Sequence, residues 1–257
     1  MSQYKLAFFD IDGTLAAHND PKVKSSMVER VPESTRLAIK KLKETGVEPI
    51  IATGRNHGMI RELLQSLNIG SFIANNGRYV VYKNQKIAHD VFSKDHLQEI
   101  VKYFESKHID YCFETIDHLY INQSSQFLDD GAMDLDKIPD GKIPDEVIQM
   151  IVRSKDSFDV PIDGIQAVKV APGVFDVTME NSNKAVGIDR ILSAMKIRAG
   201  ETLAFGDEEN DIEMFEKAGY TIAMGNGIPK IKELADYVTT DVTDDGIWNA
   251  CIALKLF

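Results

Sequence analysis

The sequence is poor in cysteine and lacks any long apolar run, and both shortages exclude classes of protein. Its 257 residues include two cysteines, Cys112 and Cys251, which form neither a disulfide framework nor a metal-binding spacing. No apolar run approaches the ~18 residues that a membrane-spanning helix needs. The apolar run that follows Met1 to Lys5 is too short for a secretion signal. These features predict a cytoplasmic protein with no membrane partner.

Positive charge is also scarce. Lysine and arginine together number 29 against 40 acidic residues, which gives a formal net charge of −11. A field of this sign repels nucleic acids, so we expect no nucleic acid partner. If the protein binds a phosphate, its positive charge must therefore be placed locally, as a metal ion or as a few lysine and arginine side chains.

Apolar strands alternate with amphipathic helices at both ends of the chain. Buried strands are predicted at Leu6–Phe9, Val47–Thr53 and Ser71–Ala74, with helices between them over 32–45 and 59–67. The same alternation returns after Lys184. Strands that alternate with helices are typical of a parallel sheet covered by helices.

The middle of the chain, from about Tyr79 to Met179, has a different pattern. Short strands follow one another there with hairpin-length connections, and the acidic segment Asp129–Pro144 is predicted to be a surface loop. This pattern indicates an antiparallel α+β unit. We therefore predict an α/β protein with a Rossmann-like parallel-sheet core over residues 1–82 and 185–257, and an inserted α+β domain over residues 83–184.

Polar clusters follow the predicted strands of the core. Asp10 and Asp12 lie two residues apart after the first strand, and Asp207 and Asp211 lie four apart across the start of a helix. Ligands bind beyond the carboxyl ends of parallel strands, so we expect these four carboxylates to converge. They would repel one another unless a cation lay between them, and ligands that offer only oxygen suit Mg²⁺ better than zinc or copper.

Some of these residues also have ordinary explanations. A lysine such as Lys184, at the start of a helix, is usually a solvated surface residue. Arg55 could contact a substrate or pair with an acid, and Asn76 could simply form a turn.

The motifs resemble those of a known superfamily. Asp10-Ile11-Asp12-Gly13-Thr14 matches the DxDGT first motif of the haloacid dehalogenase-like hydrolases. Thr53 resembles their second motif, Lys184 their third, and Gly206 to Asp211 their GDxxND fourth. Ile51 to Arg55, Asn76-Gly77 and Met224 to Gly227 are similar to the Cof-type subfamily, whose α/β cap corresponds to the inserted segment 83–184.

The resemblance implies a Mg²⁺-dependent phosphatase that hydrolyses small phosphate monoesters, such as a sugar phosphate or a similar metabolite. Asp10 would be the nucleophile and form an aspartyl phosphate, and Asp12 would be the general acid and base. The implied metal ligands are Asp10, the main-chain carbonyl of Asp12, Asp207 and Asp211. The implied phosphate- or substrate-binding residues are Ile11, Thr53, Gly54, Arg55, Asn76, Lys184 and Asn210.

Two other functions fit the same residues. A phosphomutase would use the same aspartyl phosphate but return the phosphate to another hydroxyl. A non-catalytic sugar-phosphate sensor would store or bind phosphate without turnover, although the acid–base partner Asp12 argues against it. The sequence does not determine which ester is the substrate or which oligomeric state the protein adopts. It also leaves open whether Asp211 binds the metal directly or through water.

Overall fold

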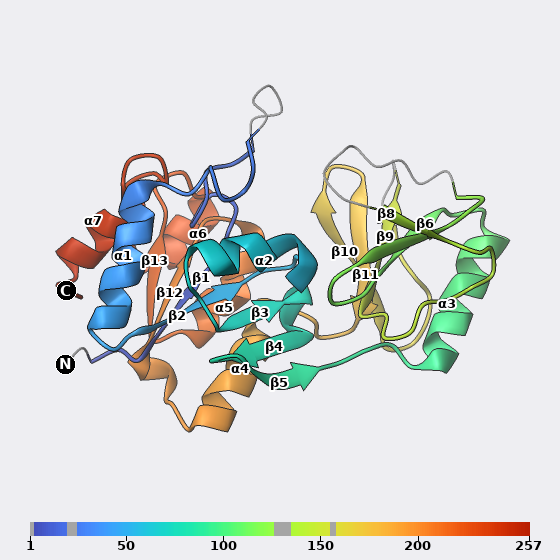
Figure 1. The fold of residues 1–257 in the computed structure, drawn as a ribbon, viewed down its shortest axis with the longest axis horizontal. Helices are drawn as coiled ribbons and strands as arrows, with labels where there is room; N and C mark the ends of the chain where they lie inside the picture. Colours follow the sequence, from blue (N-terminus) through green and yellow to red (C-terminus); the bar gives the residue numbers. More distant parts are fainter. Residues whose placement is uncertain (1–2, 20–24, 126–134, 155–157) are drawn as a thin grey trace. The chain divides into compact units, whose positions relative to one another are not determined.

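The protein is described here from a computed structural model, which describes residues 3–19, 25–125, 135–154 and 158–257. The chain divides into two compact units (Figure 1). The core unit comprises Met1–Gly54, Ile60–Ala88 and Asn183–Phe257, and the cap unit comprises Arg55–Met59 and His89–Ser182.

The core unit is built on an eight-stranded sheet in the order β14-β13-β12-β1-β2-β3-β4-β5. The pairs from β14 to β3 are parallel, and β4 joins antiparallel to β3. The strands are β1 (Leu6–Phe9), β2 (Glu48–Ala52), β3 (Phe72–Ala74), β4 (Tyr79–Tyr82), β5 (Gln85–His89), β12 (Thr202–Gly206), β13 (Tyr220–Ala223) and β14 (Tyr237–Val238). The helices are α1 (Glu33–Glu44), α2 (His57–Ser66), α4 (Lys184–Met195), α5 (Ile212–Lys217), α6 (Pro229–Leu234) and α7 (Gly246–Ala253), with short 3-10 turns η1 (Asn75–Gly77), η2 (Ala199–Glu201) and η3 (Glu209–Asp211).

Helices cover both faces of the core sheet because its central strands are apolar on both sides. Along β1, Ala7 and Phe9 belong to the apolar cluster that also contains residues of α1, α2 and α7. Leu6 and Phe8 belong to a second cluster, with residues of α4, α5 and α6. Alternate side chains of a strand point to opposite faces, so a continuous apolar run produces a strand buried on both faces.

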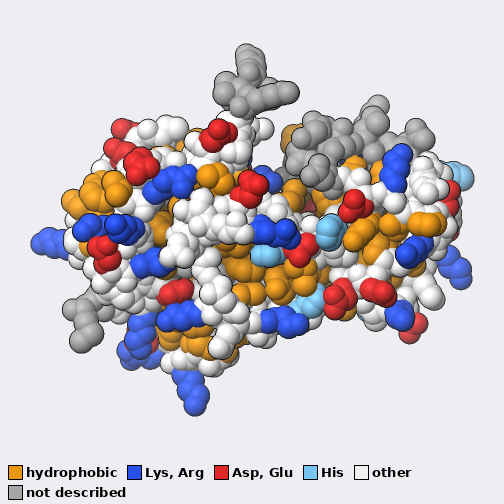
Figure 2. Space-filling model, viewed as in Figure 1, with side chains coloured by type: hydrophobic (Ala, Val, Ile, Leu, Met, Phe, Trp, Pro, Cys, Tyr) orange, Lys and Arg blue, Asp and Glu red, His pale blue; other side chains and the backbone are white. Residues whose placement is uncertain are grey.

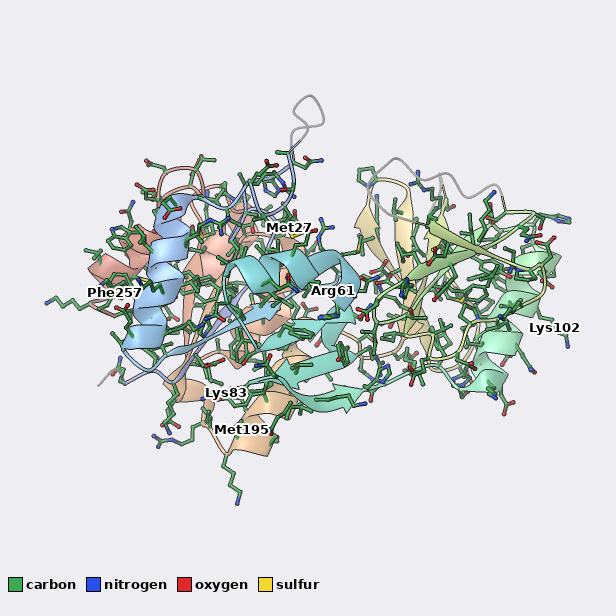
Figure 3. All side chains as sticks on the ribbon, in the orientation of Figure 1. Met27, Arg61, Lys83, Lys102, Met195 and Phe257 are labelled. Atoms are coloured by element: carbon green, nitrogen blue, oxygen red, sulfur yellow. The ribbon has the colours of Figure 1, made fainter. Side chains whose placement is uncertain are left out.

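The described part of the cap unit contains a six-stranded sheet in the order β10-β11-β9-β6-β7-β8 and the helix α3 (Lys94–Ser106). Leu97, Ile100 and Phe104 of α3 pack on one face of this sheet. Lys102 lies on the opposite side of the helix and points away from the sheet (Figure 3). The strands are β6 (Tyr111–Glu114), β7 (Leu119–Asn122), β8 (Leu135–Ile138), β9 (Gln149–Arg153), β10 (Ile165–Ala171) and β11 (Val174–Met179).

Strand β8 corrects the expectation of a surface loop over Asp129–Pro144. Leu135–Ile138 form an edge strand that pairs in parallel with β7, so the cap sheet is not purely antiparallel. Only the two end residues of β8 are half-buried, and the sequence therefore lacks the alternation that marks a strand. Residues 129–134 of the expected loop lie outside the described residues.

The division between the units falls after Ala88 and before Asn183, whereas the sequence placed it after residues 82 and 184. The physical reason at the first boundary is the hairpin of β4 and β5, which continues the core sheet. Lys83 and Asn84 form its turn with positive φ angles, of 48° and 62°.

On the face shown in Figure 2, acidic and basic side chains are interspersed over both units. No helix among the described residues has the length and apolar character needed to cross a membrane.

Candidate active site

Three neighbouring strands of the core sheet end at polar residues. Strand β1 is followed by Asp10, β2 by Thr53 and β12 by Asp207. Because β1 lies between β2 and β12 and is parallel to both, the three residues meet at one edge of the sheet (Figure 1). Asp10, Thr53 and Asp207 are all buried.

Lys184 joins two of the acids at this edge. Its ammonium nitrogen Nζ lies 2.6 Å from Asp10 Oδ1 and 2.6 Å from Asp211 Oδ1, and its side chain has no exposed surface. Lys184 is the first residue of α4, where the Asn183 side chain caps the helix by accepting a hydrogen bond from the N–H of Val186 at 3.0 Å. Burial disfavours the lysine charge, but Asp10 and Asp211 outweigh it and hold the pKa of Lys184 above its usual value.

Both carboxylate oxygens of Asp211 have partners. Oδ1 accepts from Lys184, and Oδ2 accepts from the main-chain N–H groups of Asp207 at 2.9 Å and Glu208 at 3.1 Å. A Cβ on Gly206 would lie 2.7 Å from the Asp211 side chain, so only glycine permits this close approach. Asp211 therefore fixes the loop after β12 and the position of Lys184 together.

Asp207 is held by groups from two other loops. Its Oδ1 accepts from the Thr14 hydroxyl at 2.7 Å, and its Oδ2 accepts from Asn226 Nδ2 at 3.3 Å. His18 Nε2 lies 3.4 Å from the same Oδ2. Gly13 has a φ of +87°, and a Cβ there would lie 2.0 Å from Asp207 Oδ2. The turn after β1 is thus shaped around the Asp207 carboxylate.

The electrostatics of the cluster favour a bound cation. Burial raises the pKa of Asp10 to about 7, although Lys184 opposes the shift. Burial likewise raises the pKa of Asp207 to about 8, with neighbouring Asp10 and Asp211 adding to it. Lys184 alone cannot neutralise the three carboxylates of Asp10, Asp207 and Asp211, so the cluster keeps excess negative charge when all three are ionised.

The donor set fits a hard divalent cation. Asp10, Asp207 and Asp211 each offer a carboxylate oxygen, and these oxygens all lie within 4.8 Å of one another. Oxygen ligands of this kind are those preferred by Mg²⁺. A second group that meets the same distance limit, His18, Asp207 and Glu208, is largely exposed.

Asp12 points to a different neighbour from Asp10. Its Oδ1 lies 3.5 Å from Nη1 of Arg30, and its side chain is 32% exposed. The Arg30 side chain is only 11% exposed, and its Nη1 also donates to the main-chain carbonyl of Ala17. The carboxylate of Asp12 thus remains partly accessible beside a buried guanidinium.

The other core residues predicted for phosphate or substrate binding follow the three strands β1, β2 and β3. Ile11 is buried directly after Asp10. The Asn76 main-chain N–H donates to the Thr53 carbonyl at 3.3 Å, and a Cβ on Gly54 would lie 3.1 Å from the Asn76 side chain. Asn76 has a φ of +51°, which is consistent with its expected part in a turn.

Two predicted residues remain, Arg55 and Asn210. Arg55 groups with the cap unit, and Asn210 is exposed at η3. Their roles in substrate binding stay predictions.

Four residues that contact the predicted acids were not singled out from the sequence: Thr14, His18, Arg30 and Asn226. Thr14 and Asn226 lie inside motifs that carried the family resemblance, so a signal for them was present. Asn226 also donates to the Gly13 carbonyl at 2.8 Å, which ties two loops together. His18 and Arg30 belong to no motif and had no such signal.

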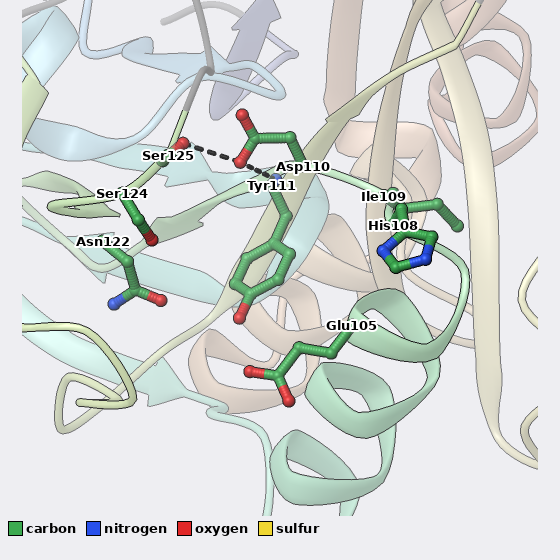
Figure 4. A pocket seen from close by; sticks show the side chains of 8 residues that line it. All are labelled: Glu105, His108, Ile109, Asp110, Tyr111, Asn122, Ser124 and Ser125. Atoms are coloured by element: carbon green, nitrogen blue, oxygen red, sulfur yellow. Dashed lines mark hydrogen bonds between the residues drawn. The ribbon is translucent and has the colours of Figure 1, made fainter.

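A separate pocket of about 550 Å³ lies within the cap unit (Figure 4). It is lined by polar groups that include Glu105, Tyr111 and Asp110, and Ser125 donates a hydrogen bond to Asp110 Oδ1 at 2.6 Å. None of the predicted site residues lines this pocket.

Comparisons with known proteins agree with these features. Residues 7–251 match the profile of the haloacid dehalogenase-like hydrolases. The Bacillus subtilis protein named "Putative phosphatase YkrA" is 32% identical over 264 residues, which cover 98% of each chain. Another B. subtilis protein, 5-amino-6-(5-phospho-D-ribitylamino)uracil phosphatase YcsE, is 27% identical over 96% of this chain and 94% of its own. The solved structure of BT4131, a sugar phosphatase of subclass IIB, is 27% identical with a TM-score of 0.77, covering 98% of this chain and 100% of its own.

The chain therefore belongs to the haloacid dehalogenase-like hydrolases, and within them it is a phosphatase, a hydrolase of phosphoric monoesters. This confirms the family and the α/β fold class predicted from the sequence.

Proposed function

We propose that the protein hydrolyses small, hydroxyl-bearing phosphate monoesters in a Mg²⁺-dependent reaction, through an aspartyl phosphate on Asp10. One observation carries the proposal: a fully buried Lys184 bridges Asp10 and Asp211, beside a third buried acid, Asp207. A structural ion pair needs one acid for one lysine. The surplus of buried carboxylate suits a site that also takes a cation and an anionic phosphate.

Asp10, Asp207 and the main-chain carbonyl of Asp12 would hold the magnesium ion. When bound, the ion supplies Lewis-acid charge that offsets the negative charge of the phosphate. Asp211 uses both its oxygens on Lys184 and on main-chain N–H groups, which favours contact with the ion through water.

The reaction proceeds in two displacements. In the first, a carboxylate oxygen of Asp10 bonds to phosphorus, and the ester oxygen departs with a proton from Asp12. In the second, a water molecule attacks phosphorus while Asp12 takes its proton, and the Asp10 carboxylate is released with inorganic phosphate. The partial exposure of Asp12 suits a group that must exchange protons with both an alcohol and water.

Lys184 and the Thr53 hydroxyl, with the main-chain N–H groups of Ile11 and Gly54, would hold the oxygens of the phosphoryl group. Charge-assisted donors fixed in a buried site stabilise the charge of the transition state without having to reorganise. The capped start of α4 fixes Lys184 in this way.

The relatives support the substrate class. YcsE is named for an ester whose phosphate sits on a ribityl chain, and BT4131 is named a sugar phosphatase. Both names describe a phosphate on a small organic molecule that carries several hydroxyl groups, and we extend that class to this chain.

The roles of Asp10 and Asp12 can be separated with 4-nitrophenyl phosphate, whose leaving group needs little protonation. Asp10→Asn should abolish both turnover and labelling. Asp12→Asn should lower the rate by about 10²–10⁴ and accumulate phosphate on the peptide that contains Asp10, because the second step still needs a base. Rapid quenching and peptide mass analysis measure the label, and a label on Asp207 would contradict the assignment.

The metal requirement has its own test. Excess chelator should remove the activity of the wild-type chain, and added Mg²⁺ should restore it and raise the melting temperature. Asp207→Asn should weaken both responses. Phosphate release without a bisphosphate activator distinguishes hydrolysis from the phosphomutase alternative, and full activity in chelator would overturn the metal proposal.

A further inference from the structure

One histidine of the core unit lies beside the buried acids. His18 is on the loop that follows β1, and its Nε2 lies 3.4 Å from Oδ2 of Asp207, which follows β12. The adjacent Glu208 offers a third ligand atom, and the three atoms all lie within 4.8 Å of one another. All three residues belong to the core unit, so this group is complete within one compact unit.

The separation between His18 and Asp207 suits two ligands of one ion better than a hydrogen bond. An N–H···O bond is most often about 2.9–3.0 Å long, and the His57–Asp117 pair of this chain is closer still, at 2.6 Å. A tetrahedral zinc ion binds nitrogen and oxygen atoms at about 2.0–2.1 Å, which places its ligands about 3.3–3.4 Å apart. His18 Nε2 and Asp207 Oδ2 therefore have the spacing of a coordinated pair.

The turn after β1 keeps space open beside both atoms. A Cβ on Gly13 would lie 2.0 Å from Asp207 Oδ2 and 2.6 Å from His18 Nε2, so both atoms face the space that a side chain at this position would fill. Asp207 Oδ1 accepts from the Thr14 hydroxyl at 2.7 Å, whereas Oδ2 has a longer contact, of 3.3 Å, with Asn226. The oxygen that faces His18 is thus the less firmly held of the two.

The kinds of ligand indicate the class of ion. Imidazole nitrogen is a good ligand for zinc and its neighbours in the first transition series, whereas Mg²⁺ prefers oxygen. Two carboxylates with a neutral imidazole balance a double positive charge, and three protein ligands leave the fourth tetrahedral position to water. The His18 side chain is 53% exposed and Glu208 is exposed as well, so an ion can enter from solvent.

We propose that His18, Asp207 and Glu208 form a transition-metal site that Zn²⁺ fits best, and that the ion bound there inhibits the enzyme by withdrawing Asp207 from magnesium. The inhibition rests on the magnesium-dependent function proposed above, whereas the binding of zinc does not.

Asp207 connects the two sites. It belongs both to this group and to the group of three acids proposed to hold magnesium. His18 adds a nitrogen ligand that favours zinc and has little affinity for Mg²⁺. The selectivity of the site for zinc therefore depends on His18, and occupancy by zinc leaves magnesium without one of its carboxylates.

Titration calorimetry of the metal-free full chain with Zn²⁺ tests the site directly. His18→Ala and Glu208→Gln should each weaken the binding of zinc at least about tenfold, because each removes one of three protein ligands. Co²⁺ is a second probe, since its visible absorption is strongest in a tetrahedral site. That absorption should appear in the wild type and be lost in His18→Ala.

Inhibition is measured on 4-nitrophenyl phosphate at a fixed Mg²⁺ concentration, with each variant compared with its own rate in the absence of zinc. The zinc concentration that halves the rate should rise at least about tenfold in His18→Ala. In the wild type, additional Mg²⁺ should relieve the inhibition, because the two ions compete for one carboxylate.

His118→Ala is the matched control. The His118 side chain is 58% exposed and lies 3.2 Å from Asp136, but this pair has no third ligand among the residues that the structure describes. The control should bind zinc as the wild type does. Unchanged zinc affinity in His18→Ala, or an equal loss in His118→Ala, would overturn the site, and zinc binding without inhibition would overturn the competition. Failure of the wild type to release phosphate with Mg²⁺ alone would instead refute the proposed function, while calorimetry would still decide the site.

Discussion

Lys184 shows at the scale of one residue how the site depends on paired charges. Its fully buried ammonium group has carboxylate partners at 2.6 Å on two sides, and those acids are themselves buried. Removing one member of a buried ion pair leaves the others uncompensated, which is far more costly than losing a surface pair.

Lys184→Met should therefore lower the free energy of unfolding by about 3 kcal/mol and abolish turnover. Lys217→Met is the matched control, since Lys217 pairs with Asp189 at 2.7 Å with both side chains about half exposed. The control should lose no more than about 1 kcal/mol. Urea unfolding of both variants measures the difference, and equal losses would show that burial of the Lys184 pair has no special cost.

Asp176 should make the stability of the cap unit depend on pH. Its pKa is raised from 3.8 to about 7 in the folded chain, so the folded state binds more protons than the unfolded state between these values. The contribution of Asp176 to the free energy of unfolding is therefore greatest below pH 4, and it falls as the pH rises toward 7. Glu114 and Arg153 are the ionisable neighbours on the same face of the sheet.

Asp176→Asn should flatten this dependence. The measurement is hydrogen exchange of the β9 and β11 amides from pH 5 to pH 8, corrected for the intrinsic exchange rate. Protection in the wild type should fall over this range relative to the variant. A wild type and variant with parallel profiles would contradict the expectation.

Gly13 allows backbone strain to be separated from a clash in the site. Both Gly13 and Gly46 have φ near +87°, but a Cβ on Gly46 meets nothing within 4 Å, whereas one on Gly13 would overlap Asp207 Oδ2. Gly46→Ala should lose about 1 kcal/mol of stability from the positive φ alone, and Gly13→Ala should lose more, because the overlap with Asp207 adds to this strain. Only Gly13→Ala should also lose activity, by about 10²-fold, because it displaces a catalytic carboxylate. Activity assays with saturating Mg²⁺ measure the difference between the two variants. Equal losses of activity would refute this interpretation.

The sequence identified the residues of the site that lie in compact motifs, and it missed those brought there by distant contacts. Asp10, Lys184, Asp207 and Asp211 follow strand ends or begin a helix, so their place could be predicted. The contact between Thr14 and Asp207 spans 193 positions, and the contact between Arg30 and Asp12 spans 18. Neither contact leaves a local pattern in the sequence.

At the scale of the element, the start of α4 joins helix stability to chemistry. Asn183 caps α4 immediately before Lys184, and Ser93 caps α3 of the cap unit in the same way, through the N–H of His96 at 3.1 Å. Asn183→Ala and Ser93→Ala should each lower the unfolding free energy by about 1 kcal/mol. Only Asn183→Ala should lower kcat, since only that helix start positions a site residue. A comparable fall in kcat for both variants would contradict the role given to the cap of α4.

Elements were predicted well where burial produces a pattern and poorly where a neighbour supplies the stability. The strands β1, β2 and β3 are buried on both faces, so each of them appears in the sequence as a short, mostly apolar run. Strand β8 gains its hydrogen bonds from β7, and α7 follows Asp245, which has a left-handed conformation and makes no side-chain cap hydrogen bond. Neither element has a capping residue at its start, or a regular spacing of apolar residues, that would have indicated it in the sequence.

At the scale of the whole molecule, the two units should divide the work of catalysis and selection. Replacing His89–Ser182 with the corresponding segment of BT4131 should transfer that protein's ester preference while keeping hydrolysis of 4-nitrophenyl phosphate. The graft must retain Ile116 and Asp117, because the Ile116 carbonyl accepts from the Gly58 N–H at 3.1 Å and Asp117 lies 2.6 Å from His57. A folded chimera that keeps the original preference profile would show that selection resides in the core unit.

The position of the cap segment in the chain also has a consequence for biosynthesis. Strand β1 pairs on one side with β2 and on the other with β12, and Leu6 is the register partner of Thr202. On the ribosome, the first half of the core sheet must wait with one edge of β1 unpaired until β12 has been made. Meanwhile, the continuous segment that forms most of the cap can close its own contacts. At about 5–20 residues per second, synthesis of the stretch between β5 and β12 takes roughly 6–22 s. During that time the nascent chain exposes an open strand edge, which is a template for misassociation, so chaperone dependence should grow when translation is slowed within the cap segment.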